Sequence, residues 1–167
     1  FIELIPFGTV PAAFSLDGKT GIFESNSILR AVARQDTQKH LYGKNHFEAS
    51  RIDSFLDSGL VFSREHQEYL FGLDDMHDSL YVRMQSAYEF FLNGVEESLK
   101  STSHIGFNFL TIIDISFFCD FSQFLREGHY EEKLKEKGFD LISENFPEEY
   151  TLTCLLYTSP SPRDLKL

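Results

Sequence analysis

The sequence predicts an α+β chain that is mostly α, with a short strand–strand–helix unit followed by an all-helical region. Two short apolar runs flank a turn near the start, and polar residues 37–46 separate this part from the rest. Every apolar stripe after residue 47 recurs at helical spacing. Hydrophobic residues make up 42% of the 167 residues and aromatic residues 15%, which is enough for a buried core and excludes a disordered chain.

The first part of the chain carries strand and turn signals. Residues 12–16 and 21–23 are short apolar runs, and Asp17-Gly18 between them is typical of a hairpin turn. The polar residues from position 24 are typical of a helix start, and the apolar residues that follow recur every three or four positions. We therefore expect two strands and a helix before the linker.

Two long apolar stripes dominate the second part. One predicts a helix over about 52–70 and the other a helix over about 76–99. Asp53 and Asp57 lie one turn apart on the first of these helices, where a solvated face is the expected role for paired carboxylates. A run of mixed charges over 131–137 predicts an exposed helix that ends at the following glycine.

Residues 107–125 form the most apolar stretch of the chain and could suggest a membrane span. Asp114 and Asp120 lie within it, and a central Asp costs about 2.5–3.5 kcal/mol to insert into a membrane. We therefore predict a helix buried at the centre of a helical bundle. Cys119 is then expected to be a small core residue rather than a reactive thiol.

The start of this buried helix has the pattern of a capping box. Thr111 can act as N-cap, with its hydroxyl accepting from the backbone N–H of Asp114, while the Asp114 carboxylate accepts from the N–H of Thr111. Leu110 and Ile115 occupy the hydrophobic-staple positions around it. A buried helix needs such a device because its first N–H groups cannot reach water.

The Ser/Pro-rich end of the chain differs from everything before it. Read as protein, it suggests a flexible tail. Residues 154–164, with the sequence CLLYTSPSPRD, also match one reading frame of a transposase sequencing adapter, and we expect them to be translated adapter. Without the run from residue 154 onward the chain has 13 basic and 25 acidic residues and a net charge of −12 instead of −11.

Charge and residue usage exclude several classes of function. A chain this acidic is unsuited to direct nucleic-acid binding, because phosphate recognition needs an excess of cations. The 6 His are scattered without metal-ligand spacing, so no metal site is expected. The 2 Cys are too few for a disulfide framework, and the first residues resemble no signal peptide, which indicates a cytoplasmic protein.

Three motifs together resemble the glutathione transferase superfamily. They are TVPA at residues 9–12, IFESNSI at 22–28, and IG at 105–106 five residues before the Thr111/Asp114 box. The motifs occur in the order and at about the spacing of that family, over roughly residues 1–150. One departure is Ile113, where the family usually has a small Ala. The transferase-like domain of elongation factor 1 gamma is similar over the same stretch.

The resemblance implies a division of the chain and a fold. It predicts a truncated thioredoxin-like domain followed by the all-α domain of glutathione transferases. The expected parts are a partial glutathione-binding domain over 1–36, a linker over 37–46, an all-helical domain over 47–153, and adapter-derived residues 154–167.

The resemblance also implies a glutathione-binding site. In the family the bond before the proline that matches Pro11 is cis, and the N–H and C=O of Val10 can then pair with the cysteinyl part of glutathione like an added strand. Glu24 and Ser25 match the pair that holds the γ-glutamyl group, where a carboxylate suits its ammonium and helix N-terminal N–H groups suit its carboxylate. Taken alone, these residues also fit a turn proline and a helix cap.

Two functions follow from this resemblance. The first is an enzyme that conjugates glutathione, as co-substrate, to small apolar electrophiles. The second is a non-catalytic interaction domain of the elongation factor 1 gamma type, a scaffold in translation. The thiol-activating residue of the family falls ahead of the position matching Phe1, so the catalytic residue is unknown. Both imply a homodimer without a cofactor, a metal, a membrane or a nucleic acid as partner.

Overall fold

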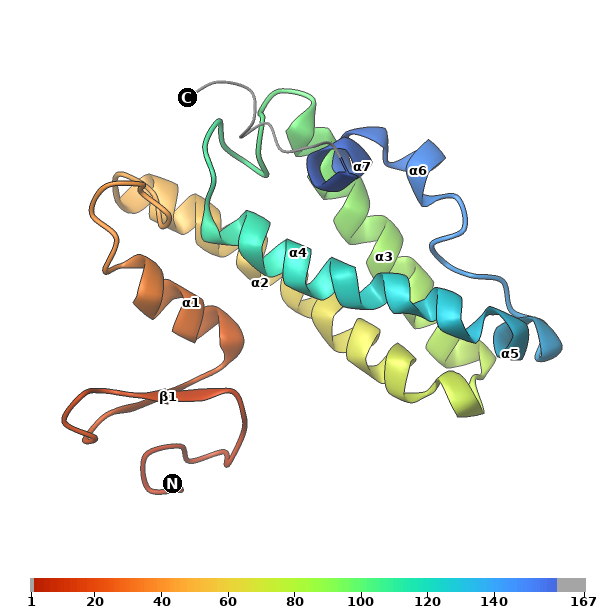
Figure 1. Ribbon diagram of the computed structural model, residues 1–167, viewed down its shortest axis with the longest axis horizontal. Coiled ribbons are helices and arrows are strands. Elements are labelled where there is room, and N and C mark those ends of the chain that lie inside the picture. The colour runs from red at the N-terminus through yellow and green to blue at the C-terminus, as the bar shows by residue number, and fades with distance from the viewer. Residues whose placement is uncertain (1, 159–167) are drawn as a thin grey trace.

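The computed structural model describes residues 2–158 and begins with a small hairpin (Figure 1). Strands β1 (Ala12–Phe14) and β2 (Gly21–Phe23) are antiparallel, and α1 (Ser25–Ala33) follows them. Gly18 lies in the turn with φ of 68°, and its N–H donates to the carbonyl of Ser15 at 2.8 Å. Both predicted strands and the helix are therefore confirmed, although β1 ends two residues earlier than expected.

The other elements of the described residues are helices, joined by loops. The elements are α2 (His46–Phe71), η1 (Leu73–Asp75), α3 (Asp78–Leu99), α4 (Ile112–Phe124), η2 (Leu125–Tyr130), α5 (Glu131–Glu136), α6 (Phe146–Glu149) and α7 (Thr151–Thr158). Figure 1 shows the long helices α2, α3 and α4 packed together, with the hairpin and α1 near one end and α5 at the other. The chain is therefore α+β and mostly α, as the sequence predicts.

The C-terminal tail is described only in part. Helix α7 includes residues 154–158, and the rest of the Ser/Pro-rich run, residues 159–167, lies outside the described residues. The adapter origin of this run stays a prediction. Within the part of the chain that the structure describes, no helix is both long and apolar enough to cross a membrane.

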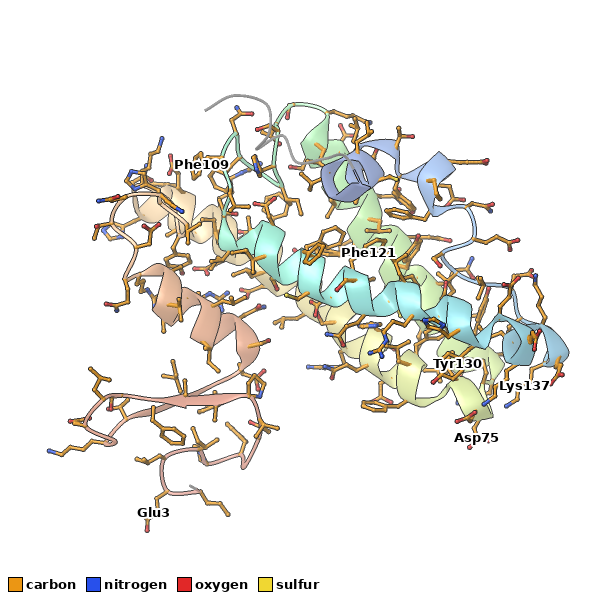
Figure 2. All side chains as sticks on the ribbon, viewed as in Figure 1. Glu3, Asp75, Phe109, Phe121, Tyr130 and Lys137 are labelled. Carbon is orange, nitrogen blue, oxygen red and sulfur yellow. The ribbon has the colours of Figure 1, made fainter. Side chains whose placement is uncertain are left out.

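A cluster of aromatic rings forms the core between the long helices. The ring centroids of Phe62 on α2 and Phe91 on α3 lie 5.4 Å apart, and those of Phe91 and Phe117 on α4 lie 5.6 Å apart. Phe121 of α4 reaches Phe146 of α6 at 4.6 Å, and Figure 2 shows Phe121 on the side of α4 that faces the neighbouring helices. Rings of this size account for a large share of the buried apolar surface.

Cys119 corrects one expectation. It is exposed on α4, not packed in the core. At about 100° per residue, Cys119 lies about 200° around the helix from the buried Phe117 and from the buried Phe121, so it faces away from α2 and α3. The neighbouring Phe118 is exposed as well. The helix is thus central to the fold but is buried on only part of its circumference.

The first turn of α4 has both bonds of a capping box. The Thr111 hydroxyl accepts from the N–H of Ile113 at 3.2 Å, and the Asp114 carboxylate accepts from the N–H of Thr111 at 2.9 Å. The other Asp114 oxygen accepts from the N–H of Ile105 at 3.0 Å, and the N–H of Ile112 donates to the carbonyl of Leu41 at 3.0 Å. Asp114 is buried, so one carboxylate fixes both the helix start and the preceding loop.

Replacing Asp114 by Ala should lower the free energy of unfolding by about 2–4 kcal/mol, because buried N–H groups lose their acceptor. Urea denaturation measures this. Asp78→Ala is the matched control, since Asp78 is an exposed acid in the first turn of α3 and should cost less than about 0.5 kcal/mol. Equal losses in the two variants would contradict the structural role of Asp114.

A buried histidine lies in the aromatic core. The His66 ring is parallel to Phe62 at 5.9 Å and edge-on to Phe124 at 5.9 Å, and its Nε2 has no hydrogen-bond partner among the described residues. Burial lowers the pKa of His66 from 6.5 to about 4, because the charged imidazolium would lose its hydration there. The ring is therefore neutral at pH 7.

This lowered pKa predicts a pH-dependent loss of stability. Between pH 6.5 and about 4 the unfolded chain binds a proton at His66 that the folded chain does not. The contribution of the neutral His66 ring to the free energy of unfolding is therefore complete above pH 6.5. It is lost as the pH falls toward 4, by about 3 kcal/mol at most. His66→Phe keeps an aromatic ring and removes the titration, so its urea midpoint should fall less than that of the parent between these pH values. Parallel pH profiles would contradict this account.

Candidate functional site

The strand register brings the predicted site residues together. The last printed pair of β1 and β2 joins Ala12 to Phe23, so Pro11 directly precedes β1 and Glu24 directly follows β2 at the same end of the hairpin. Val10 and Ser25 are the next residues outward on either side. The Val10–Pro11 peptide bond is cis. Val10 is 82% exposed, which leaves this backbone accessible to a ligand. The four residues singled out in the sequence therefore lie at one end of the hairpin.

Glu24 and Ser25 lie where the hairpin meets α1. Glu24 precedes the helix with φ of 68°, which for a residue other than glycine is uncommon. Glu24 is the N-cap residue of α1, but its exposed side chain makes no cap hydrogen bond. Ser25 is the first residue of α1, where free N–H groups favour an anion. A carboxylate beside a helix N-terminus suits a ligand that carries both charges.

A cavity of 270 Å³ separates this end of the hairpin from α4. Its walls combine a few polar groups with apolar side chains, which is typical of small-molecule sites. The lining residues are Pro11, Ser25, Ile28, Leu29, Ile115, Ser116, Cys119 and Asp120. The staple residue Ile115 thus contributes to this wall, whereas Leu110 is partly exposed outside it.

Cys119 and Asp120 belong to this wall although the sequence analysis gave neither a role there. Asp120 accepts a hydrogen bond from the hydroxyl of Ser63 on α2, and burial raises the pKa of its carboxyl. The only sequence signal for Asp120 was its position as an acid inside the apolar stretch 107–125, and that signal served only to argue against a membrane span. Which side of the helix it faces could not be read from an apolar run.

Polar contacts hold α1 against the helical region. Asn26 Oδ1 accepts from the hydroxyl of Ser116 at 3.1 Å, and its Nδ2 donates to the carbonyl of Leu56 at 3.4 Å. Asn26 thereby joins α1 to both α4 and α2. The position of the cavity wall depends on these contacts.

An ion-pair network on α1 and α2 corrects the expectation for one of the two paired acids, Asp53. Arg30 on α1 donates to Asp53 at 2.6 Å and to Asp57 at 3.0 Å, and the Tyr42 hydroxyl donates to Asp53 at 2.8 Å. Asp53 is therefore not on a simply solvated face. It is the acceptor that ties α1 and the linker to α2, because its neighbours come from both. Asp57 remains exposed.

Among the described residues, no group of three or more His, Cys, Asp or Glu is placed to hold a metal ion. The chemistry supported by the residues at the cavity is recognition of a small molecule with a charged end and an apolar end. The charged end would meet the start of α1 at Ser25, and the apolar end would meet Ile115 and the neighbouring aliphatic side chains. Val10 and Glu24 adjoin Pro11 and Ser25 in the sequence but do not line the cavity.

Comparison with solved structures finds similar folds among glutathione transferases. A Gtt2-class glutathione S-transferase of Vibrio parahaemolyticus aligns with a TM-score of 0.61 and 18% identity, over 88% of this chain and 64% of that one. Glutathione transferase F2 from Populus trichocarpa has a TM-score of 0.59 and 19% identity, over 91% and 75% of the two chains. Poplar glutathione transferase F1 has a TM-score of 0.64 and 16% identity, over 98% and 76%.

These similarities define the fold. The chain has the architecture of glutathione transferases, with part of a thioredoxin-like unit followed by the all-α domain. It spans 64% of the length of the Vibrio enzyme. No protein-family model matches the sequence, and a search of curated proteins also finds no match.

Removing the Arg30 guanidinium should weaken the attachment of α1. The Arg30 side chain is 18% exposed and that of Asp53 is 35% exposed, so Arg30→Ala should lower the free energy of unfolding by about 1–2 kcal/mol. Lys100→Ala is the control, because Lys100 and Glu97 form a pair that is 60% and 73% exposed and should contribute less than about 0.5 kcal/mol. Thermal or urea unfolding compares the two, and indistinguishable losses would contradict this role of Arg30.

Proposed function

We propose that this chain is part of a glutathione transferase-like enzyme that binds glutathione at Val10, Pro11, Glu24 and Ser25. The observation that carries the proposal is the cavity between the hairpin end and α4, lined by Pro11 and Ser25 on one side and by Ile115 on the other. The glutathione-transferase fold of the chain supports the same assignment.

Each group has a distinct role in this proposal. The exposed backbone of Val10 pairs with the cysteinyl part of glutathione as an added strand would. The Glu24 carboxylate binds the ammonium of the γ-glutamyl group, and the start of α1 at Ser25 binds its carboxylate. Both charged contacts are formed by groups that have no side-chain hydrogen bond within the described residues, so binding breaks no existing bond.

The second substrate is proposed to be a small apolar electrophile. Ile28, Leu29 and Ile115 supply an apolar wall next to the glutathione position, and apolar contact favours such molecules. The reaction joins the glutathione sulfur to the electrophilic atom, while the leaving group departs with the displaced electron pair. The group that activates the thiol is not assigned. The same resemblance supports a cytoplasmic homodimer.

Glu24→Gln should weaken glutathione binding by about tenfold or more, because the ligand ammonium loses a charged acceptor. Calorimetric titration of the chain with reduced glutathione measures the change. Glu3→Gln is the matched control, since Glu3 is exposed in the same part of the chain but lies outside the hairpin end, and it should leave binding unchanged. Unchanged binding in Glu24→Gln would overturn the assigned site.

Conjugation separates the enzyme from the non-catalytic alternative. The enzyme should form a thioether between glutathione and a chromogenic aryl halide, and Ile115→Asp should raise the KM for the halide by placing a charge in the apolar wall. Glutathione binding without any thioether product would instead fit a scaffold domain of the elongation factor 1 gamma type. Val82→Asp, at an exposed position on α3 outside the cavity, controls for an added charge.

A further inference from the structure

A second, larger cleft lies near the other end of the helical bundle. It has a volume of 860 Å³ and is formed by the C-terminal end of α2 together with η1, η2, and the ends of α4 and α5 that adjoin η2. Figure 2 shows Tyr130, one of its lining residues, at the opposite end of the molecule from Glu3 and the hairpin. The cleft is therefore separate from the proposed glutathione site.

The charge of this cleft is opposite to that of the chain. The sequence has 26 acidic residues and a net charge of −11, yet none of the described residues that line the cleft is acidic. Its lining consists of three basic side chains, a buried neutral imidazole, two amides, and apolar or aromatic side chains. The residues are Arg126, His129, Lys133, His66, Gln67, Gln123, Leu70, Phe71, Leu73 and Tyr130.

The basic side chains form one row. Arg126 and His129 are three residues apart on η2, where such positions lie one above the other, and Lys133 follows four residues later on α5. Arg126 and His129 form no ion pair within the described part of the chain. Lys133 is held at 2.5 Å from the Asp74 carboxylate. The row therefore offers an unpaired guanidinium and an unpaired imidazole, with a third group that is partly neutralised.

Glu127, the residue after Arg126, does not neutralise this row. Glu127 is fully buried and accepts a hydrogen bond from the Tyr69 hydroxyl at 2.8 Å and from the N–H and hydroxyl of Ser143. Its carboxylate is thus engaged with the core side of η2. A planar guanidinium with free donors binds phosphate in a two-pronged arrangement, and a neighbouring base adds to the attraction.

The rest of the cleft fits an aromatic heterocycle. Phe71 is 89% exposed, so its aromatic face is available for stacking, whereas the Lys133 ammonium lies over the Tyr130 ring at 5.6 Å from its centroid. The amides of Gln67 and Gln123 each carry donors and an acceptor, which can pair with the edge of a nucleobase. The volume lies within the range of about 300–1,000 Å³ that is usual for small-ligand sites.

We propose that this cleft binds a nucleoside monophosphate, with the phosphate at Arg126 and His129 and the base against Phe71 and between the amides of Gln67 and Gln123. A phosphate monoester carries a charge of about −1.5 to −2 at pH 7, which matches two unpaired bases better than a single carboxylate does. A nucleic-acid polymer is not the ligand, because its many phosphates would meet the acidic surface of the rest of the chain.

The test is calorimetric titration of the full chain with adenosine monophosphate, adenosine, inorganic phosphate and benzoate. Adenosine monophosphate should bind about tenfold or more tightly than each of the other three, because only it engages both parts of the cleft. No binding at millimolar adenosine monophosphate would overturn the proposal. Benzoate binding of equal strength would overturn it as well, since the cleft would then accept any aromatic anion.

Two substitutions locate the binding. Arg126→Ala should weaken adenosine monophosphate binding by about tenfold or more, and Arg126→Lys should weaken it less, since it keeps the charge but loses the planar pair of donors. Arg64→Ala is the matched control, because Arg64 is an exposed arginine of α2 outside the cleft. Equal binding by the Arg126→Ala and Arg64→Ala variants would overturn the proposal.

Phe71→Ala tests the base contact independently of the charge. It should weaken adenosine and adenosine monophosphate alike and leave the response to inorganic phosphate unchanged. Because Arg126 and Phe71 are both exposed, their variants should melt at the parent temperature. Glu24→Gln should not alter nucleotide binding, so failure of the glutathione site and failure of this cleft are distinguishable. Loss of nucleotide binding in Glu24→Gln would contradict two separate sites.

Discussion

The rest of the structure depends on the buried carboxylate of Asp114. A helix that starts inside a protein presents N–H groups that cannot reach water, and leaving them without acceptors would oppose folding. Asp114 accepts from Ile105 and Thr111, and the carbonyl of Leu41 accepts from Ile112. These bonds connect the linker and the loop after α3 to the first turn of α4. The direction of α4 is set there, and α4 supplies one wall of the proposed glutathione cavity.

A second constraint positions the small unit that carries the hairpin. A two-stranded hairpin alone is at best marginally stable, so its placement must come from contacts with the helical region. Arg30 and Asn26 on α1 make these contacts, the first to carboxylates of α2 and the second to α2 and α4. The cavity is the space that remains between Pro11, Ser25 and α4 once these contacts are made. The site is therefore a product of the packing of the two parts.

The sequence predicted the elements well because their signals are local. The turn at Asp17-Gly18 and the long apolar stripes identify the hairpin, α2 and α3, since a turn and a helical period each require only nearby residues. Cys119 was predicted wrongly because its stretch was treated as buried on all sides, although Ser116 and Asp120 beside it lie on a face of α4 that is only partly buried. The acceptor role of Asp53 was missed because its partner Arg30 lies 23 residues earlier and meets it only after packing.

The two candidate sites differ in the same way, because one has a local sequence motif and the other is assembled only by packing. The residues of the hairpin end were found in the sequence because a resemblance singled them out, and the strand register then shows that they lie together. The cleft near η2 has no such motif. Its basic row repeats every three or four residues, but it lies next to a mixed-charge run and suggests only an exposed helix. One of its amides, Gln67, and its exposed aromatic ring, Phe71, come from α2, more than 50 residues before Arg126 in the chain. A net charge describes a whole chain, whereas binding depends on charges that folding places within a few ångströms of the ligand. An acidic protein can therefore contain a site for a small anion, even though its total charge argues against a polyanion.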